Sequence, residues 1–162
     1  MDEKEYLILK TAILNEIEGE TFYQLAADNV KDPDMRGVFL YLAKEEQNHQ
    51  QILKYMLEQI TAGKEISVEI TNLETKSPGI FKLQDAARTV DNLEISAVST
   101  GILMEKASVD YYRQAASTSS NPSAKNLYEN LISWEMGHLE ELEKMYDFLR
   151  QNWFDQQGFS TS

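Results

Sequence analysis

The sequence contains two copies of one segment, related by a constant offset of 89 residues, as from Glu16 to Glu105. Acidic, histidine and proline residues recur in register, at Glu16/Glu105, Pro33/Pro122, Glu46/Glu135 and His49/His138, and no gap is needed between them. A repeat kept in register indicates duplication of a structural unit. Two copies that face each other would share one core with pseudo-twofold symmetry.

Each copy has the pattern of a helical hairpin. Apolar residues recur at steps of three and four, which is typical of amphipathic helices. Asp32-Pro33 and Asn121-Pro122 interrupt this pattern, and both pairs combine a capping residue with a proline suited to the first helical position. Because these connections are short, we expect antiparallel hairpins over about residues 2–60 and 92–150.

The segment between the hairpins, about residues 61–91, loses clear helical periodicity and contains Gly63, Pro78 and Gly79. Within it, Phe81 to Arg88 could form a short helix. We interpret it as a long crossover connection. The prediction is therefore an all-α fold with residues 1–162 as one domain and residues 151–162 as a C-terminal tail.

The repeated acidic and histidine residues lie on the apolar stripes of the expected helices. Glu16 falls between Ile13 and Tyr23, and each copy places a Glu-x-x-His pair 30 residues after this first glutamate. Residues three apart share one helix face. The core would then receive four carboxylates and two imidazoles, although burying carboxylates together is costly because like charges repel.

Two divalent cations would compensate these charges. One Glu from each of two helices and a Glu-x-x-His from each of the other two is the ligand set of ferritin-like di-iron and di-manganese bundles. We therefore predict a ferritin-like four-helix bundle whose metal ligands are Glu16, Glu46, His49, Glu105, Glu135 and His138. Mixed imidazole and carboxylate ligands suit iron or manganese better than calcium or magnesium, so we expect two ions of iron, of manganese or of both.

Several neighbouring residues have two interpretations. Tyr23 and Tyr112 follow their glutamates by seven residues, two turns along the same face, and either hydrogen-bond the metal carboxylates or pack in the core. Glu20, four residues after Glu16, is an exposed helix residue or an extra ligand. Trp134 is expected in packing or at an interface. The solvated face is expected to hold Glu18, Glu45, Glu140 and Glu143.

Composition excludes some classes of partner. The net charge of −12 disfavours nucleic acid and anionic membranes. No stretch approaches the ~20 apolar residues of a membrane span, and the charged start Met1 to Glu5 does not resemble a secretory signal. The chain has no cysteine, which excludes disulfides and thiolate metal sites and fits a cytoplasmic protein.

Glu16–Ala27, Glu46–His49 and their copies resemble the ferritin-like domain of the rubrerythrin family. The resemblance implies a non-haem di-iron site that reduces hydrogen peroxide, or reacts with dioxygen, using electrons from a redox partner. Full rubrerythrins also carry a Cys-ligated rubredoxin module, so this chain would need a separate donor such as a rubredoxin-like protein. Typical members have another Glu one turn beyond the third-helix ligand, where this chain has Ser108.

The leading functional prediction is therefore a rubrerythrin-like di-iron oxidoreductase, acting as a homodimer. One alternative is iron oxidation and storage, as in ferritins and bacterioferritins. Another is a di-iron hydroxylase, which would need an apolar pocket opening onto the metals. A third is a bundle that binds no metal and serves in protein interactions.

Overall fold

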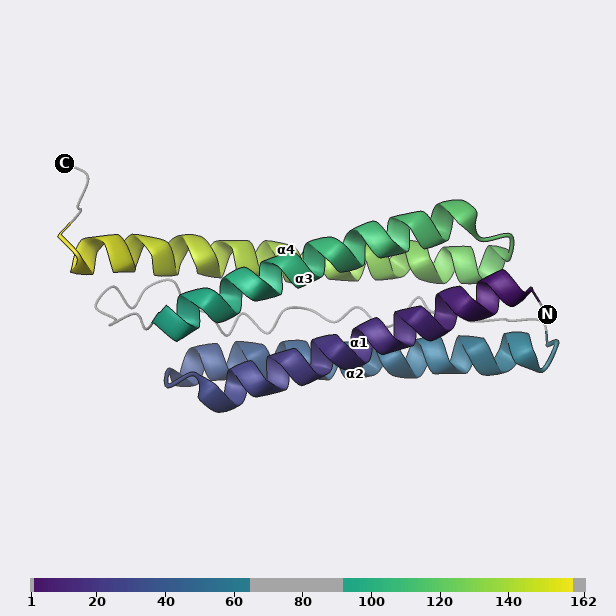
Figure 1. Cartoon of the computed structure of the whole chain (residues 1–162), viewed down its shortest axis with the longest axis horizontal. Helices are drawn as coiled ribbons and strands as arrows, with labels where there is room; N and C mark the ends of the chain where they lie inside the picture. Colours follow the sequence, from purple (N-terminus) through teal and green to yellow (C-terminus); the bar gives the residue numbers. More distant parts are fainter. Residues whose placement is uncertain (1, 65–91, 159–162) are drawn as a thin grey trace.

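The computed structural model describes residues 2–64 and 92–158, which form four long helices. They are α1 (Glu3–Asn29), α2 (Pro33–Thr61), α3 (Asn92–Thr118) and α4 (Pro122–Gln156). Helix α1 pairs with α2 and α3 with α4, each as an antiparallel hairpin (Figure 1). The predicted pair of hairpins is confirmed. The predicted start of the tail is wrong, because α4 continues through residues 151–156.

The second helix of each hairpin begins with the same kind of N-cap, a polar side chain followed by a proline. The Asp32 carboxylate accepts hydrogen bonds from the backbone N–H groups of Asp34 and Met35, both at 2.9 Å. Asn121 accepts from Ser123 at 3.0 Å and from Ala124 at 3.1 Å. These side chains satisfy backbone donors that have no partner within the helix, and a proline occupies the position where no donor is needed. Both caps were expected from the sequence.

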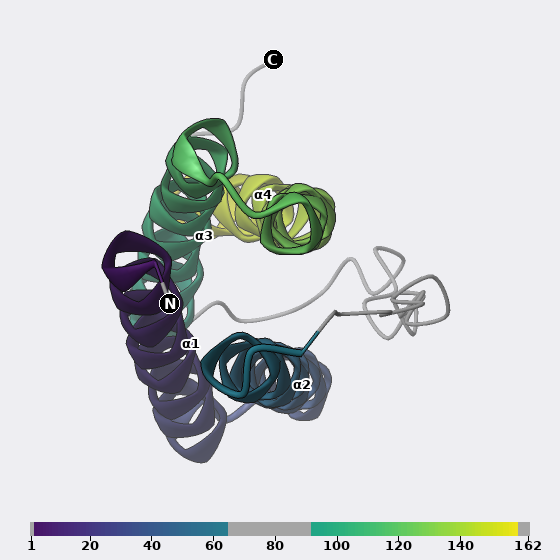
Figure 2. The same cartoon turned by 90° about the vertical axis from the view of Figure 1, so that its right-hand side faces the viewer.

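The helices form two layers. Viewed along the bundle, α1 and α3 lie side by side in one layer and α2 and α4 form the other (Figure 2). The apolar core is divided into two clusters. One includes Tyr23, Phe39 and Leu142, and the other includes Leu9 and Leu131. On every helix the acidic and histidine residues of the repeat fall between the two clusters, so a polar layer crosses the middle of the bundle.

The expected crossover lies largely outside the described residues. Helix α2 ends at Thr61, and the predicted short helix from Phe81 to Arg88 falls in the part that the structure does not describe. Within residues 2–64 and 92–158, no helix is both long enough and apolar enough to cross a lipid bilayer.

Candidate metal centre

The bundle brings all six predicted ligand residues into one buried cluster. Helices α1 and α3 each contribute one glutamate, and α2 and α4 each contribute a Glu-x-x-His pair. Each of the six residues is at most 5% exposed: Glu16, Glu46, His49, Glu105, Glu135 and His138. The sequence placed these residues on core-facing stripes, and the structure confirms that placement. That they bind metal stays a prediction.

The cluster divides into two overlapping groups of four. The first group is Glu16, Glu46, His49 and Glu135, and the second is Glu46, Glu105, Glu135 and His138. Within each group the ligand-type atoms lie within 4.8 Å of one another. Glu46 and Glu135 belong to both groups, whereas each group has its own histidine and its own further glutamate. Each group would be able to hold one metal ion, with Glu46 and Glu135 available to both.

Both imidazoles turn Nδ1 towards the shared carboxylates. His49 Nδ1 lies 3.1 Å from Glu135 Oε1 and 3.2 Å from Glu16 Oε2. His138 Nδ1 lies 3.1 Å from Glu135 Oε2. Each oxygen of Glu135 therefore faces a different imidazole. The Glu46 oxygens do the same at longer range, 3.8 Å from His49 Nδ1 and 3.6 Å from His138 Nδ1.

Without metal, protons compensate the charges of this cluster. Burial, together with the charge of Glu135, raises the pKa of Glu46 well above its ordinary value and that of Glu105 to about 7. Burial also disfavours ionised Glu135, but the two adjacent imidazoles outweigh it and lower the Glu135 pKa below its ordinary range. Burial by itself would lower the pKa of His49 and of His138. The carboxylates that face the two imidazoles have the larger effect, so the pKa of His49 rises to about 10 and that of His138 rises well above its usual value.

The donor set fits a pair of transition-metal ions. Among the residues that the structure describes, Glu135 Oε1 is the single buried side-chain oxygen or nitrogen without a well-directed hydrogen bond, although His49 Nδ1 lies 3.1 Å from it. It lies where the two groups overlap. A buried carboxylate oxygen without a well-directed hydrogen bond is costly, and a cation bound there would remove that cost. Imidazole nitrogen combined with carboxylate oxygen suits iron or manganese.

Two tyrosines hold the outer glutamates in place. Tyr23 on α1 donates a hydrogen bond to Glu105 on α3, and Tyr112 on α3 donates to Glu16 on α1. The sequence left a hydrogen-bonding and a packing role open, and the structure shows the hydrogen bonds. Each tyrosine bonds the glutamate of the other hairpin. Burial and the neighbouring carboxylates raise the pKa of both phenols, so they stay protonated and act as donors.

Glu20 lies outside both groups of four. Its side chain is partly buried, and it accepts a hydrogen bond from Gln50 Nε2 at 2.5 Å and a longer one from Gln47 Nε2 at 3.5 Å. These two amides donate hydrogen bonds to both oxygens of the Glu20 carboxylate, whereas Glu16, one turn earlier on α1, points into the cluster.

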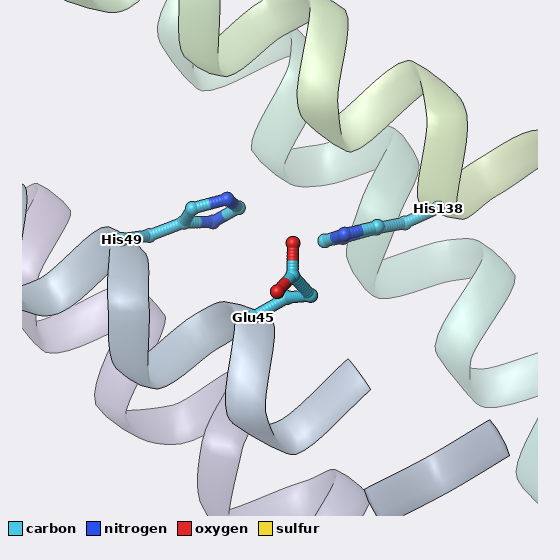
Figure 3. Close-up of side chains that lie close together, drawn as sticks. All are labelled: Glu45, His49 and His138. Carbon is cyan, nitrogen blue, oxygen red and sulfur yellow. The ribbon is translucent and has the colours of Figure 1, made fainter. Parts of the chain in front are cut away.

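Glu45 was wrongly expected on the solvated face. Its side chain is 4% exposed and lies near both His49 and His138, with ligand-type atoms of the three within 4.8 Å of one another (Figure 3). The equivalent residue in the second copy is Trp134, which is partly buried and stacks on His49 with ring centroids 5.4 Å apart. At this position of the repeat, one copy therefore places a carboxylate beside the imidazoles and the other places an indole ring there. A comparison of the two copies at this position is the signal that could have found Glu45.

The other residues expected on the solvated face, Glu18, Glu140 and Glu143, are exposed.

Comparison with known proteins agrees with this geometry. The family model described as Rubrerythrin matches residues 8–146, which is most of the chain. The chain belongs to the rubrerythrin family. Comparison with curated protein sequences finds no match. The family match covers α2 and α3, most of α1 and of α4, and all six residues of the candidate metal centre.

Two solved structures share the fold of this rubrerythrin-family chain. A hypothetical protein from Pyrococcus furiosus is 24% identical, with a TM-score of 0.69, and the match covers 94% of this chain and 93% of that one. A bacterioferritin-related protein from Bacteroides fragilis, described as a dodecameric thioferritin, is 17% identical, with a TM-score of 0.66, and the match covers 98% and 92% of the two chains. At these identities the likeness establishes the ferritin-like fold alone.

The raised pKa of His49 predicts how the metal-free protein responds to alkali. A raised histidine pKa contributes stability that is fully present below the ordinary value of 6.5 and is lost as pH rises through about 10. We therefore expect the free energy of unfolding of the metal-free protein, measured with urea, to fall across this interval. His49→Gln should flatten the decline. A metal-free protein whose stability stayed constant over this range would contradict the assigned charges.

The tyrosine hydrogen bonds predict two equivalent losses. Tyr112→Phe leaves Oε1 of Glu16 without the phenol that donates to it, and Tyr23→Phe does the same to Oε1 of Glu105. Each change should lower the free energy of unfolding of the metal-free protein by about 1–3 kcal/mol, the usual cost of an unsatisfied buried group. Tyr55, which is 48% exposed, provides the control, because Tyr55→Phe should be nearly neutral. Buried variants that matched this control would show that the hydrogen bonds do not stabilise the centre.

Proposed function

We propose that this protein is a di-iron oxidoreductase that reduces hydrogen peroxide with electrons from a separate donor. The observation that carries the proposal is the pair of overlapping groups, each with one histidine and one glutamate of its own and with Glu46 and Glu135 in common. Membership of the rubrerythrin family supports the same reading.

Reduction of hydrogen peroxide to two water molecules consumes two electrons and two protons. A pair of ferrous ions held by the six residues would supply one electron each and would stabilise the negative charge that develops on oxygen. The protein keeps the ligands in a fixed geometry. Tyr23 and Tyr112 orient the outer carboxylates, and burial leaves little of the shared ones exposed to solvent.

Electrons would have to reach the centre from another molecule. The 162 residues include no cysteine, so the chain cannot bind the iron of a rubredoxin-type module. A rubredoxin-like protein is the donor that the family resemblance suggests. We place this activity in the cytoplasm and expect a homodimer.

A hydroxylase acting on an organic substrate is less well supported. The cavity that reaches the centre has a volume of about 310 Å³ and lies between α1 and α3. Its lining includes Glu18, Asn15 and Ser108 as well as Glu46 and Glu105. Met104, Ala107 and Tyr111 also line it, so the walls are mixed, and the carboxylates among them would be desolvated at a cost by an apolar substrate, which favours a small oxidant.

Iron oxidation and storage is the second candidate function. It is favoured by the structural likeness to the bacterioferritin-related protein, which is described as dodecameric. A storage function would require a large hollow assembly, whereas a peroxidase needs only a small oligomer. The native mass of the purified protein separates the two candidates.

The proposed activity predicts a preference between oxidants. The anaerobically reduced, iron-loaded protein should be oxidised faster by hydrogen peroxide than by dioxygen, because cleavage of the O–O bond of peroxide needs only the two electrons that the irons hold. Stopped-flow mixing with each oxidant measures both rates, and repeated turnover should require an added electron donor. The Glu46→Ala variant, lacking a shared ligand, is the control and should show neither reaction.

Faster oxidation by dioxygen, accompanied by growth of a ferric mineral, would contradict the peroxidase proposal and support storage.

A further inference from the structure

The cavity between α1 and α3 is open because two small residues face it. Gly19 on α1 and Ser108 on α3 both line it and occupy equivalent positions in the repeat, 89 residues apart. A Cβ atom on Gly19 would lie 3.3 Å from the Glu46 carboxylate. The backbone of α1 therefore passes close to a shared ligand, and side chains larger than these two would fill the space above it.

The cavity connects solvent with the candidate ligands. Glu18 and Ala107 are exposed at its outer end, whereas Glu46 and Glu105 line it from within the buried cluster. An ion that entered here would meet one exposed carboxylate first. It would then meet a carboxylate of each metal position, because Glu46 belongs to both groups and Glu105 to the second.

The charge of the lining selects among solutes. Its acidic residues are Glu18, Glu46 and Glu105, and no lysine, arginine or histidine of residues 2–64 and 92–158 lines it. A pocket lined by one sign of charge concentrates ions of the opposite sign. The Glu18 carboxylate at the outer end therefore attracts divalent cations, and Glu46 and Glu105, whose pKa values are raised in the metal-free protein, would become anionic as an arriving cation displaces their protons.

A smaller cavity of about 190 Å³ reaches the centre from the side of α4. Its lining includes Ser133, Trp134 and His138, with Glu140 and Glu141 towards solvent. The residue of the metal centre that it reaches is His138, whose Nδ1 points away towards Glu135. An ion in this cavity would meet none of the four carboxylates of the centre.

We propose that the α1–α3 cavity is the path by which divalent metal ions load the centre, with Glu18 as the first contact and Glu46 and Glu105 as the receiving ligands. This inference rests on the metal-binding part of the proposed function and is independent of the reaction that the loaded centre performs. It assigns roles to Gly19, Ser108 and Glu18 that the ligand set alone does not.

Loading can be followed with Co²⁺, which takes the same ligands and absorbs visible light when bound by nitrogen and oxygen. Metal-free protein is mixed with Co²⁺ in a stopped-flow instrument, and the metal content is measured again after equilibration. Ser108→Leu should slow uptake by an order of magnitude or more, because packed side chains leave little space for an ion, while the final Co²⁺ content stays that of the wild type. Ser133→Leu makes the same change in the smaller cavity and should load at the wild-type rate.

A second pair of variants tests the charge without changing the packing. Glu18→Gln should lower the rate of uptake by about two- to fivefold at low ionic strength, and added salt should remove the difference. Glu140→Gln, at the mouth of the smaller cavity, should have no such effect. Wild-type rates in both Ser108→Leu and Glu18→Gln, or slow loading in Ser133→Leu and Glu140→Gln instead, would overturn the proposed path. A wild-type protein that bound no Co²⁺ at equilibrium would instead contradict the metal centre itself.

Discussion

The structure depends on the burial of four carboxylates and two imidazoles at the middle of a four-helix bundle. These groups separate the apolar core into two clusters, so every helix changes from apolar to polar and back along its inner face. Such burial is costly unless opposite charge lies within the cluster. In the metal-free protein the protonated imidazoles flank Glu135 and supply part of that charge, while metal ions would supply more and would displace those protons.

The internal repeat explains why neither hairpin can form the centre alone. The group around His49 needs Glu135 from α4, and the group around His138 needs Glu46 from α2. The tyrosine hydrogen bonds also join the two hairpins. Tyr23 of the first hairpin donates to Glu105 of the second, and Tyr112 of the second donates to Glu16 of the first. Binding of metal is therefore linked to docking of the two hairpins, and this linkage connects the fold to the proposed function.

The sequence predicted most of this arrangement because the helical period assigns each residue to a face. The six ligand candidates, the caps and the two hairpins follow from that period and from the repeat. The partners across the bundle do not follow, because the period of one helix does not determine which residue of another helix lies opposite. Tyr23 was therefore placed correctly but without its partner Glu105, and Glu45 was assigned to solvent although it is buried near His138 of α4. The length of α4 beyond residue 150 was missed because its last turns are largely exposed.

The number of metal ions that each chain binds tests the central claim most directly. Anaerobic titration of the metal-free protein with Fe²⁺, followed by removal of unbound ion and elemental analysis, gives this number without reference to any reaction. Two overlapping groups of ligands predict about two ions per chain. Since Glu46 and Glu135 are shared and equivalent, Glu46→Ala and Glu135→Ala should each weaken both positions to a similar degree. A wild-type chain that bound no iron, or held one ion at saturation, would contradict the account.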